Sequence, residues 1–362
     1  MKRRTGAGLL AVAAVAFALT AGAQAERRAI HPTVLTQPAW SPDGRHVAWV
    51  AGPPNGYGTV WVADASGRNA QPLHQFGHSL LDGVDGVGQI AWATPTSLLV
   101  DARLNGVVQL FRLTLHGRAT VLTQLSDLNF STDRSRRLVA TTGYSDTCGS
   151  LNCPAPIDIL DTTALSVTAV GSPGEADLFP ALAPDGRRVA YDRAACSPTG
   201  CGQAHGVWLR AASGKGGARE IVHSGEYPVW SPDGRLIAYI RPWRNHTTLL
   251  QVLRLGGKPR SFASHATPLF SPDSRFLAYS AGYGRIDKRT GSSPAGVAVV
   301  DLRTRRMILR PKTFQTVDTA RGAWSPDGTE LLVSARTASA QCDSLWITRI
   351  RSGRWRPFRS CG

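Results

Sequence analysis

Residues 230–240 read Trp-Ser-Pro-Asp-Gly-Arg-Leu-Ile-Ala-Tyr-Ile. The Ser-Pro-Asp-Gly segment predicts a tight turn, because Pro presets φ at the first central position, Asp suits the second, and Gly adopts the left-handed conformation that closes a bulged hairpin. The apolar run after the turn is almost continuous, which indicates a strand buried on both faces. The stretch therefore predicts a hairpin in a sheet that packs between two other sheets.

This pattern occurs seven times, and a repeat at a steady period indicates an array of similar units. The second copy keeps only Trp92 and Pro95 of the motif, and the third reads Thr132-Asp133-Arg134-Ser135 without the Pro. The other copies of the pattern span residues 40–50, 92–100, 130–140, 182–191, 270–279 and 324–333.

Each copy continues into a third strand, a Gly-rich turn and a weaker outer strand, and one unit takes about 48 residues. Four strands in a unit of this length are typical of a β-propeller blade. No long helical period is present, and a β-solenoid would have much shorter coils. We therefore expect an all-β fold, a seven-bladed β-propeller of four-stranded antiparallel blades. Because two copies are weak, six blades is the alternative.

The motif resembles the repeats of the TolB-like propeller family, which place a Pro-Asp-Gly hairpin between the innermost and second strands. The resemblance spans residues 38–361. The Gly-His and Trp-Asp marks of the WD40 repeat are absent, and nothing here matches the separate domain that precedes the propeller in TolB. The resemblance thus implies a relative in fold, without implying the function of TolB.

The first residues have the pattern of a secretory signal peptide. Lys2, Arg3 and Arg4 precede an apolar stretch over residues 9–19, and Ala23-Gln24-Ala25 matches a signal-peptidase site. The apolar stretch is short for a membrane span of about 20 residues, so an uncleaved anchor is the weaker alternative. We expect a signal peptide over residues 1–25, a single propeller domain over 26–362, and a periplasmic or secreted protein.

Six cysteines in an exported chain predict three disulfides. Spacing does not settle the connectivity, since six cysteines allow 15 pairings. Two short C-x4-C segments could also hold a metal, although export favours oxidation. The pairs suggested by spacing are Cys148 with Cys153, Cys196 with Cys201, and Cys342 with Cys361.

In a four-stranded blade, alternate turns open on opposite faces of the ring. Long loops gather on the face that carries the turns between second and third strands, and ordered loops on a rigid scaffold often carry recognition. Tolerated insertions are the alternative. The predicted partner surface on this face consists of Tyr144, Asp146, Tyr283, Arg285, Lys288 and Arg289.

The opposite face carries the Asp-Gly turns and is rich in arginine. The whole chain has a formal net charge of +16, and a surface of one sign attracts polyanions. An arginine-rich surface that only faces solvent is the alternative. The predicted anion-binding residues are Arg187, Arg188, Arg235, Arg275, Arg305 and Arg306.

Recognised catalytic motifs are missing: there is no G-x-S-x-G, P-loop or dinucleotide fingerprint. His74, His78, Asp82 and Asp85 could ligate a divalent metal, but they fall in loop sequence without a helix to set their spacing. We therefore expect no catalytic, cofactor or metal residues.

The first interpretation is an exported, non-catalytic, monomeric propeller that binds an envelope or extracellular protein, or an anionic cell-surface polymer, and no nucleic acid. The alternatives are a metal-dependent lyase or hydrolase acting on an anionic polysaccharide through the channel, and an accessory propeller related to those of peptidases.

Overall fold

The computed structural model divides into two units, residues 1–31 and 32–362. The first unit, with the predicted signal peptide, lies outside the described residues. The ranges described are 34–53, 58–77, 86–125, 129–142, 156–171, 175–197, 200–242, 248–263, 268–282, 295–309 and 313–361.

The described strands form seven sheets in sequence order, here called blades 1 to 7. Blade 1 contains β1 (Val34–Trp40), β2 (His46–Gly52), β3 (Gly58–Asp64) and β4 (Gln71–Phe76). Blade 2 contains β5 (Gly86–Thr94), β6 (Ser97–Leu104), β7 (Val107–Thr114) and β8 (Ala119–Leu125). Blade 3 contains β9 (Phe130–Thr132), β10 (Leu138–Thr142), β11 (Ile157–Asp161) and β12 (Ser166–Ala169). Blade 4 contains β13 (Glu175–Leu182), β14 (Arg188–Ser197), β15 (Gly200–Ala211) and β16 (Arg219–His223).

The remaining blades follow the same plan. Blade 5 contains β17 (Glu226–Trp230), β18 (Leu236–Pro242), β19 (Thr248–Arg254) and β20 (Arg260–Ala263). Blade 6 contains β21 (Leu269–Phe270), β22 (Phe276–Gly282), β23 (Ala295–Asp301) and β24 (Met307–Leu309), with β25 (Thr313–Phe314) also paired to β23. Blade 7 contains β26 (Thr316–Trp324), β27 (Glu330–Arg336), β28 (Ser344–Arg349) and β29 (Trp355–Arg359).

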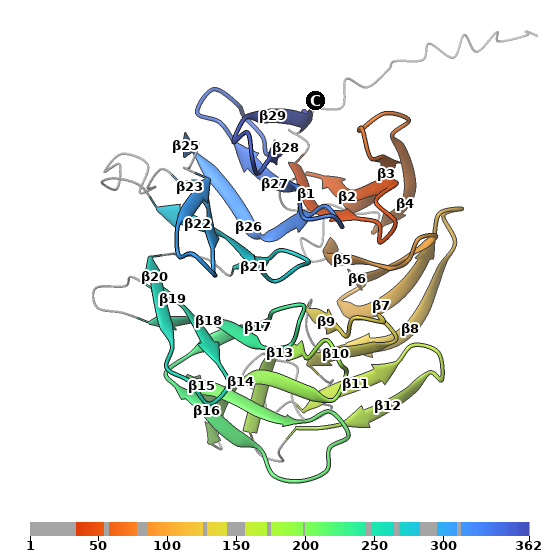
Figure 1. The fold of residues 1–362 in the computed structure, drawn as a ribbon. Coiled ribbons are helices and arrows are strands. Elements are labelled where there is room, and N and C mark those ends of the chain that lie inside the picture. The colour runs from red at the N-terminus through yellow and green to blue at the C-terminus, as the bar shows by residue number, and fades with distance from the viewer. Residues whose placement is uncertain are drawn as a thin grey trace, which may run out of the picture. The chain divides into compact units, whose positions relative to one another are not determined.

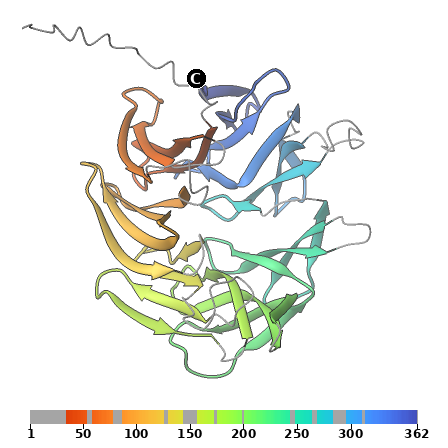
Figure 2. The ribbon, with the colours of Figure 1, turned by 180° about the vertical axis from the view of Figure 1, so that it is seen from behind.

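The blades are arranged as a ring, with the first strand of each blade nearest the centre and the fourth at the periphery (Figure 1). The view from behind shows the same order of blades (Figure 2). Neighbouring strands of a blade pair antiparallel, as β17 does with β18 and β18 with β19. The prediction of a seven-bladed, four-stranded propeller is confirmed. Within the described ranges no helix is long and apolar enough to cross a membrane.

Alternate side chains of a second strand pack against different neighbouring blades. In β18, Ile237 lies in a core cluster with blade 4, and Ala238 lies in a cluster with blade 6. Both are fully buried. This two-sided burial explains the continuous apolar run in the sequence, because neither face of the strand meets water.

The Ser-Pro-Asp-Gly turns are held by a short hydrogen-bond network. In blade 5 the Ser231 hydroxyl donates to Asp233 Oδ1 at 2.6 Å and accepts from the backbone N–H of Leu236 at 2.9 Å. The motif tryptophan then ties its blade to the preceding one, since Trp230 Nε1 donates to the Ala181 carbonyl at 3.0 Å. The motif therefore specifies both a hairpin and a contact between blades.

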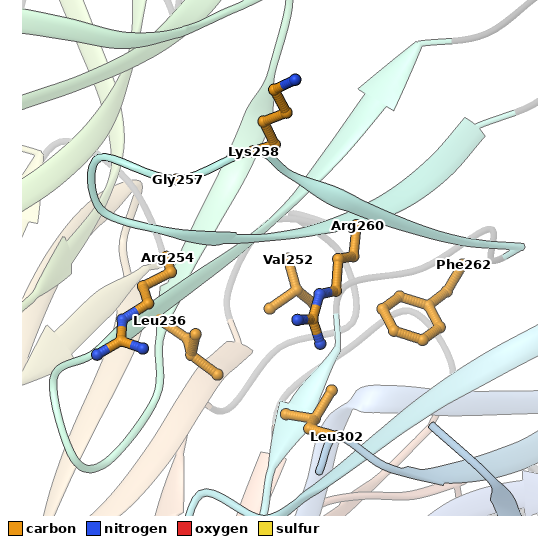
Figure 3. Close-up of a pocket in the computed structure, with 8 residues that line it drawn as sticks. All are labelled: Leu236, Val252, Arg254, Gly257, Lys258, Arg260, Phe262 and Leu302. Atoms are coloured by element: carbon orange, nitrogen blue, oxygen red, sulfur yellow. The ribbon is translucent and has the colours of Figure 1, made fainter. Parts of the chain in front are cut away.

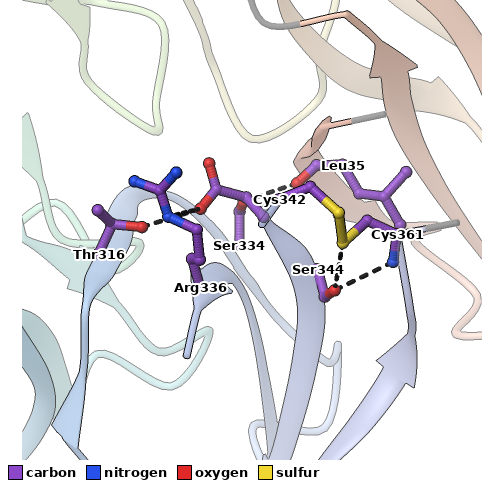
Figure 4. Close-up of a disulfide and its surroundings, with 8 residues drawn as sticks. Leu35, Thr316, Ser334, Arg336, Cys342, Ser344 and Cys361 are labelled. Atoms are coloured by element: carbon purple, nitrogen blue, oxygen red, sulfur yellow. Dashed lines mark hydrogen bonds and ion pairs between the residues drawn. A yellow bond between two sulfur atoms is a disulfide. The ribbon is translucent and has the colours of Figure 1, made fainter. Parts of the chain in front are cut away.

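Blades 7 and 1 meet at the point where the ring closes. β1 packs against β26, β27 and β28, and the backbone N–H of Leu35 donates to the Asp343 carbonyl at 3.0 Å. The Ser334 hydroxyl donates to the Leu35 carbonyl at 2.6 Å. A disulfide joins Cys342 to Cys361 across the β28–β29 hairpin beside this junction (Figure 4), as expected. No strand is exchanged between blades in the described part of the chain.

Candidate functional site on the inner strands of blades 4 and 5

The loop surface expected from the sequence lies outside the described residues, and so do two of the cysteines. Cys196 and Cys201 are register partners in the backbone pairing of β14 with β15. The residues that the structure does not describe are Tyr144, Asp146, Cys148, Cys153, Tyr283, Arg285, Lys288 and Arg289.

The predicted basic face is less uniform than the sequence suggests. Arg187, Arg235, Arg305 and Arg306 are exposed on turns. By contrast, Arg275 donates to Asp301 Oδ2 through Nε at 2.9 Å and Nη2 at 2.8 Å. The guanidinium of Arg188 lies 5.0 Å from the centre of the Trp230 ring. Ion pairing and ring stacking therefore occupy part of the charge that was expected to face solvent.

A bulge in the inner strand recurs in blades 1, 4 and 5. Two residues of the first strand lie opposite one residue of the second, and the first of the two has a positive φ: 55° at Gln37, 48° at Phe179 and 53° at Tyr227. Positive φ is unusual for bulky aromatic residues, and strained backbone of this kind clusters at functional sites. The surroundings of Phe179 and Tyr227 therefore form the candidate site.

Each of these residues precedes a proline. The segments 37–40, 179–182 and 227–230 read Gln-Pro-Ala-Trp, Phe-Pro-Ala-Leu and Tyr-Pro-Val-Trp. Proline is tolerated at the free edge of a sheet because no partner strand needs its missing N–H, and the inner strand is such an edge. This X-Pro-x-apolar signal was available in the sequence, but its functional meaning was missed because the Ser-Pro-Asp-Gly turn dominates the repeat.

The two aromatic bulge residues meet across the blade junction. The ring centres of Phe179 and Tyr227 are 4.4 Å apart and the ring planes are inclined by 54°. Tyr227 is 38% exposed, and Phe179 is half-buried. Two backbone segments with positive φ thus place an aromatic pair on the innermost strands of blades 4 and 5.

A buried carboxyl lies behind this pair. Asp192, on β14, is 1% exposed, and its Oδ2 accepts a hydrogen bond from the backbone N–H of Tyr227 at 2.9 Å. Its Oδ1 has no hydrogen-bond partner among the described residues. Burial raises the pKa of Asp192 well above the ordinary carboxyl range, and the charge of Glu226 adds to the rise.

Two more titratable groups adjoin Asp192. Burial raises the pKa of Glu226. The phenol pKa of Tyr227 is also raised, first by burial and then by the charges of Glu226 and Asp192. A carboxyl and a phenol with perturbed pKa values, both partly accessible, form an arrangement that can exchange protons with a bound molecule.

The rest of the cluster is fixed by an arginine on β14. Arg193 binds Asp177 with two hydrogen bonds of 2.7 and 2.9 Å and donates to the Tyr191 hydroxyl at 3.0 Å. Its guanidinium lies 4.6 Å from the centre of the Trp208 ring. These bonds hold the β13–β14 pair rigidly behind Phe179, which is what a preorganised site requires.

The described residues do not fit a metal centre. No group of three or more His, Cys, Asp or Glu side chains in the described ranges could hold a metal ion. Of the histidines whose side chains are described, His46 begins a second strand, His74 and His223 lie on fourth strands, and His116 lies in an outer turn. His78, Asp82 and Asp85 lie outside the described residues.

Solved structures with a similar fold include enzymes. An oligogalacturonate lyase from Vibrio parahaemolyticus matches with a TM-score of 0.62 at 10% identity, over 88% of this chain and 91% of that chain. A puromycin hydrolase matches with a TM-score of 0.64 at 14% identity, over 91% of this chain and 54% of that chain. A TolB from Acinetobacter baumannii matches with a TM-score of 0.49 at 14% identity, over 76% of this chain and 62% of that chain.

Protein-family models and curated proteins give no match to the sequence. The observed propeller has its Ser-Pro-Asp-Gly hairpins between the first and second strands of a blade, where the motif predicted them. The interpretation of the chain as a non-catalytic interaction scaffold is wrong, because the propellers it resembles belong to proteins named as a lyase and a hydrolase. The non-catalytic interpretation arose because the chain lacks the sequence motifs by which catalytic sites are usually recognised.

Proposed function

We propose that the protein is an enzyme that cleaves an acidic oligosaccharide by β-elimination at the Phe179–Tyr227 site. The observation that carries the proposal is the aromatic pair on the bulged inner strands, with the buried Asp192 carboxyl bonded to the backbone N–H of Tyr227. The likeness to an oligogalacturonate lyase over nearly the full length of both chains supports it. So does the net charge of +16, since a positive field draws in anionic substrates.

The roles of the residues follow from their protonation. In elimination from a uronate, a base takes the proton next to the carboxylate, a carbon–carbon double bond forms, and the bond to the glycosidic oxygen breaks. Glu226 is the base, because a raised pKa makes its carboxylate a stronger proton acceptor. Tyr227, whose phenol is protonated at neutral pH, gives its proton to the leaving oxygen.

Phe179 and Asp192 assist Glu226 and Tyr227 by binding the substrate and positioning the backbone. Phe179 offers an apolar face on which a sugar ring can pack. Asp192 anchors the backbone of Tyr227 through its carboxyl oxygen. Because the pKa of Asp192 is raised, less negative charge stands beside the site to repel an anionic substrate.

We place the enzyme outside the cytoplasm. The Cys342–Cys361 disulfide is consistent with an oxidising compartment. The N-terminal sequence has the features of a secretory signal. Secretion of the chain can be tested by fractionating expressing cells and locating the protein by immunoblot.

The test is a cleavage assay on the full chain. Oligogalacturonate and an alginate oligosaccharide are the acidic substrates, and a neutral malto-oligosaccharide is the control. Each is assayed with added manganese and with a chelator. We expect new ultraviolet absorbance from an unsaturated product with the acidic substrates only. New reducing ends without that absorbance would mean hydrolysis and would refute the elimination step.

Two variants assign the reaction to the site. Glu226→Gln and Tyr227→Phe should each lower kcat at least 100-fold, the usual contribution of a general acid or base. Glu220→Gln is the matched control, since Glu220 lies on the outer strand β16 and contacts His223. If the two variants cleave as fast as the unmodified chain, the site takes no part in the reaction. If the folded protein cleaves no acidic oligosaccharide, the proposal is wrong.

A further inference from the structure

A hollow of about 360 Å³ lies where the outer half of blade 5 meets blade 6, away from the inner-strand site. Figure 3 shows the side chains that line it, mostly from β19, β20 and the turn between them. The lining residues are Leu236, Val252, Arg254, Gly257, Lys258, Arg260, Phe262 and Leu302.

The hollow has an apolar floor and a cationic rim. Val252 is buried, and Leu236 and Leu302 are half-buried. Arg254 and Arg260 are exposed on the rim, and in Figure 3 the Arg260 guanidinium extends between Val252 and Leu302. No lining residue is acidic.

The charge at the end of the third strand differs between blade 5 and several other blades. Arg254 pairs in register with Leu236 at the end of the third strand. The residue in the same register position is Asp64 in blade 1, Asp161 in blade 3 and Asp301 in blade 6. Each of those aspartates accepts hydrogen bonds from the backbone N–H groups of the following turn. Blade 5 thus carries a cation where three other blades carry an anion.

In blade 7 an arginine at this register position has a carboxylate partner, which Arg254 of blade 5 lacks in the described part of the chain. Blade 7 also has an arginine at this register position, Arg349, but Glu330 directly opposite binds it at 3.0 Å. In blade 5 the opposite residue is Leu236, and no carboxylate partner of Arg254, Lys258 or Arg260 is present among the described residues. A positive rim without a counter-charge above an apolar floor is complementary to a molecule with the opposite pattern.

We propose that this hollow is a second binding site, for a small organic carboxylate with an apolar body. Two arginines on the rim suit a carboxylate, because the planar guanidinium can donate two parallel hydrogen bonds to it. The apolar floor suits an aliphatic or aromatic tail. The volume is at the lower end of the range for small-molecule sites, so the ligand is a single compact molecule. The sugar acids proposed as substrate carry hydroxyl groups around the ring and lack the apolar tail that this floor suits.

Decanoate is the probe, measured by isothermal titration calorimetry on the full chain. Decanol carries the same tail without the charge, and acetate carries the charge without the tail. We expect saturable binding of decanoate at one site, with at least tenfold weaker binding of both controls. Equal affinity for decanol would mean that the cations contribute nothing, and this would overturn the proposal.

Variants locate the binding. Arg254→Asp, which introduces the charge found in blades 1, 3 and 6, and Arg260→Gln should each weaken decanoate binding at least tenfold, since hydrogen bonds to charged groups are the strong ones. Arg118→Asp, exposed in an outer turn of blade 2, is the control with the same change in net charge as Arg254→Asp. Unchanged binding in both site variants, or an equal loss in the control, would refute the site. Because the cleavage assay uses other residues, failure here leaves the proposed function untouched.

Discussion

Arg136 of blade 3 occupies the turn position that Gly234 occupies in blade 5, and both have left-handed backbone, with φ of 61° and 71°. The surrounding hydrogen bonds match. Asp133 Oδ1 accepts from the backbone N–H of Leu138 at 3.0 Å, as the Ser231 hydroxyl accepts from that of Leu236. Blade 3 therefore keeps the turn with Asp and Ser exchanged and with an arginine at the glycine position.

Arg136→Gly should stabilise the protein. A non-glycine residue in left-handed conformation costs roughly 1 kcal/mol. Burial also lowers the pKa of Arg136, which means that its charge is poorly solvated. We expect the free energy of unfolding to rise by about 1 kcal/mol, as measured by urea denaturation. Arg136→Ala is the control, because it removes the guanidinium without relieving the backbone. A glycine variant no more stable than the alanine variant would contradict the strain argument.

Removing the Cys342–Cys361 disulfide should destabilise blade 7. The bridge closes a loop with a sequence separation of 19, for which chain entropy predicts about 3 kcal/mol. The double variant Cys342→Ser, Cys361→Ser tests this in thermal unfolding without reductant. Ser344→Ala is the comparison, since its hydroxyl accepts from the Cys361 backbone N–H at 3.0 Å. An unchanged midpoint in the double variant would show that the hairpin is held by packing alone.

The phenols of Tyr191 and Tyr239 should lose their protons at a higher pH than a tyrosine in the unfolded chain. Burial, and then the charge of Asp177, raise the pKa of Tyr191 to about 12, and burial raises that of Tyr239 to about 12. Because the folded state holds these protons more tightly than the unfolded chain, stability should fall between about pH 10 and pH 12. Phenolate absorbance followed against pH measures the deprotonation of these tyrosines. Tyr191→Phe and Tyr239→Phe should each remove part of the late absorbance change, and a single step near pH 10 would contradict the prediction.

Asp192 should make stability depend on pH in a lower range. Its pKa is raised in the folded state, so the stability it contributes is fully present below about pH 4 and is lost as pH rises through the folded-state value. In Asp192→Asn this loss should disappear. We expect the variant to gain stability relative to the unmodified chain as pH increases, by about 1 to 3 kcal/mol. Parallel stability curves against pH would show that Asp192 stays charged.

The fold was largely predictable because its decisive features are local. Pro232, Asp233 and Gly234 specify a turn from neighbouring residues alone, and the apolar run after them reports burial on two faces. The blade count was also predictable from the period of the repeat, even where blade 3 replaces Ser231 and Gly234 by Asp133 and Arg136.

The candidate site was not predictable, because it depends on contacts between blades. Asp192 and Tyr227 are far apart in the sequence and meet only when β14 packs against β17. Neither belongs to a recognised catalytic motif. The strained φ at Phe179 and Tyr227 is a property of the backbone, and the only sequence trace of it is the proline that follows each residue.

The junction between blades 1 and 7 has a consequence for protein engineering. Each blade is a continuous segment of chain, and Leu35 lies beside Asp343, next to the cysteine that is bonded to Cys361. A short linker between residues 361 and 34 should therefore be tolerated, and new ends could be opened between any two blades. Circularly permuted versions of this ring would place either terminus beside whichever blade an experimenter wishes to tag.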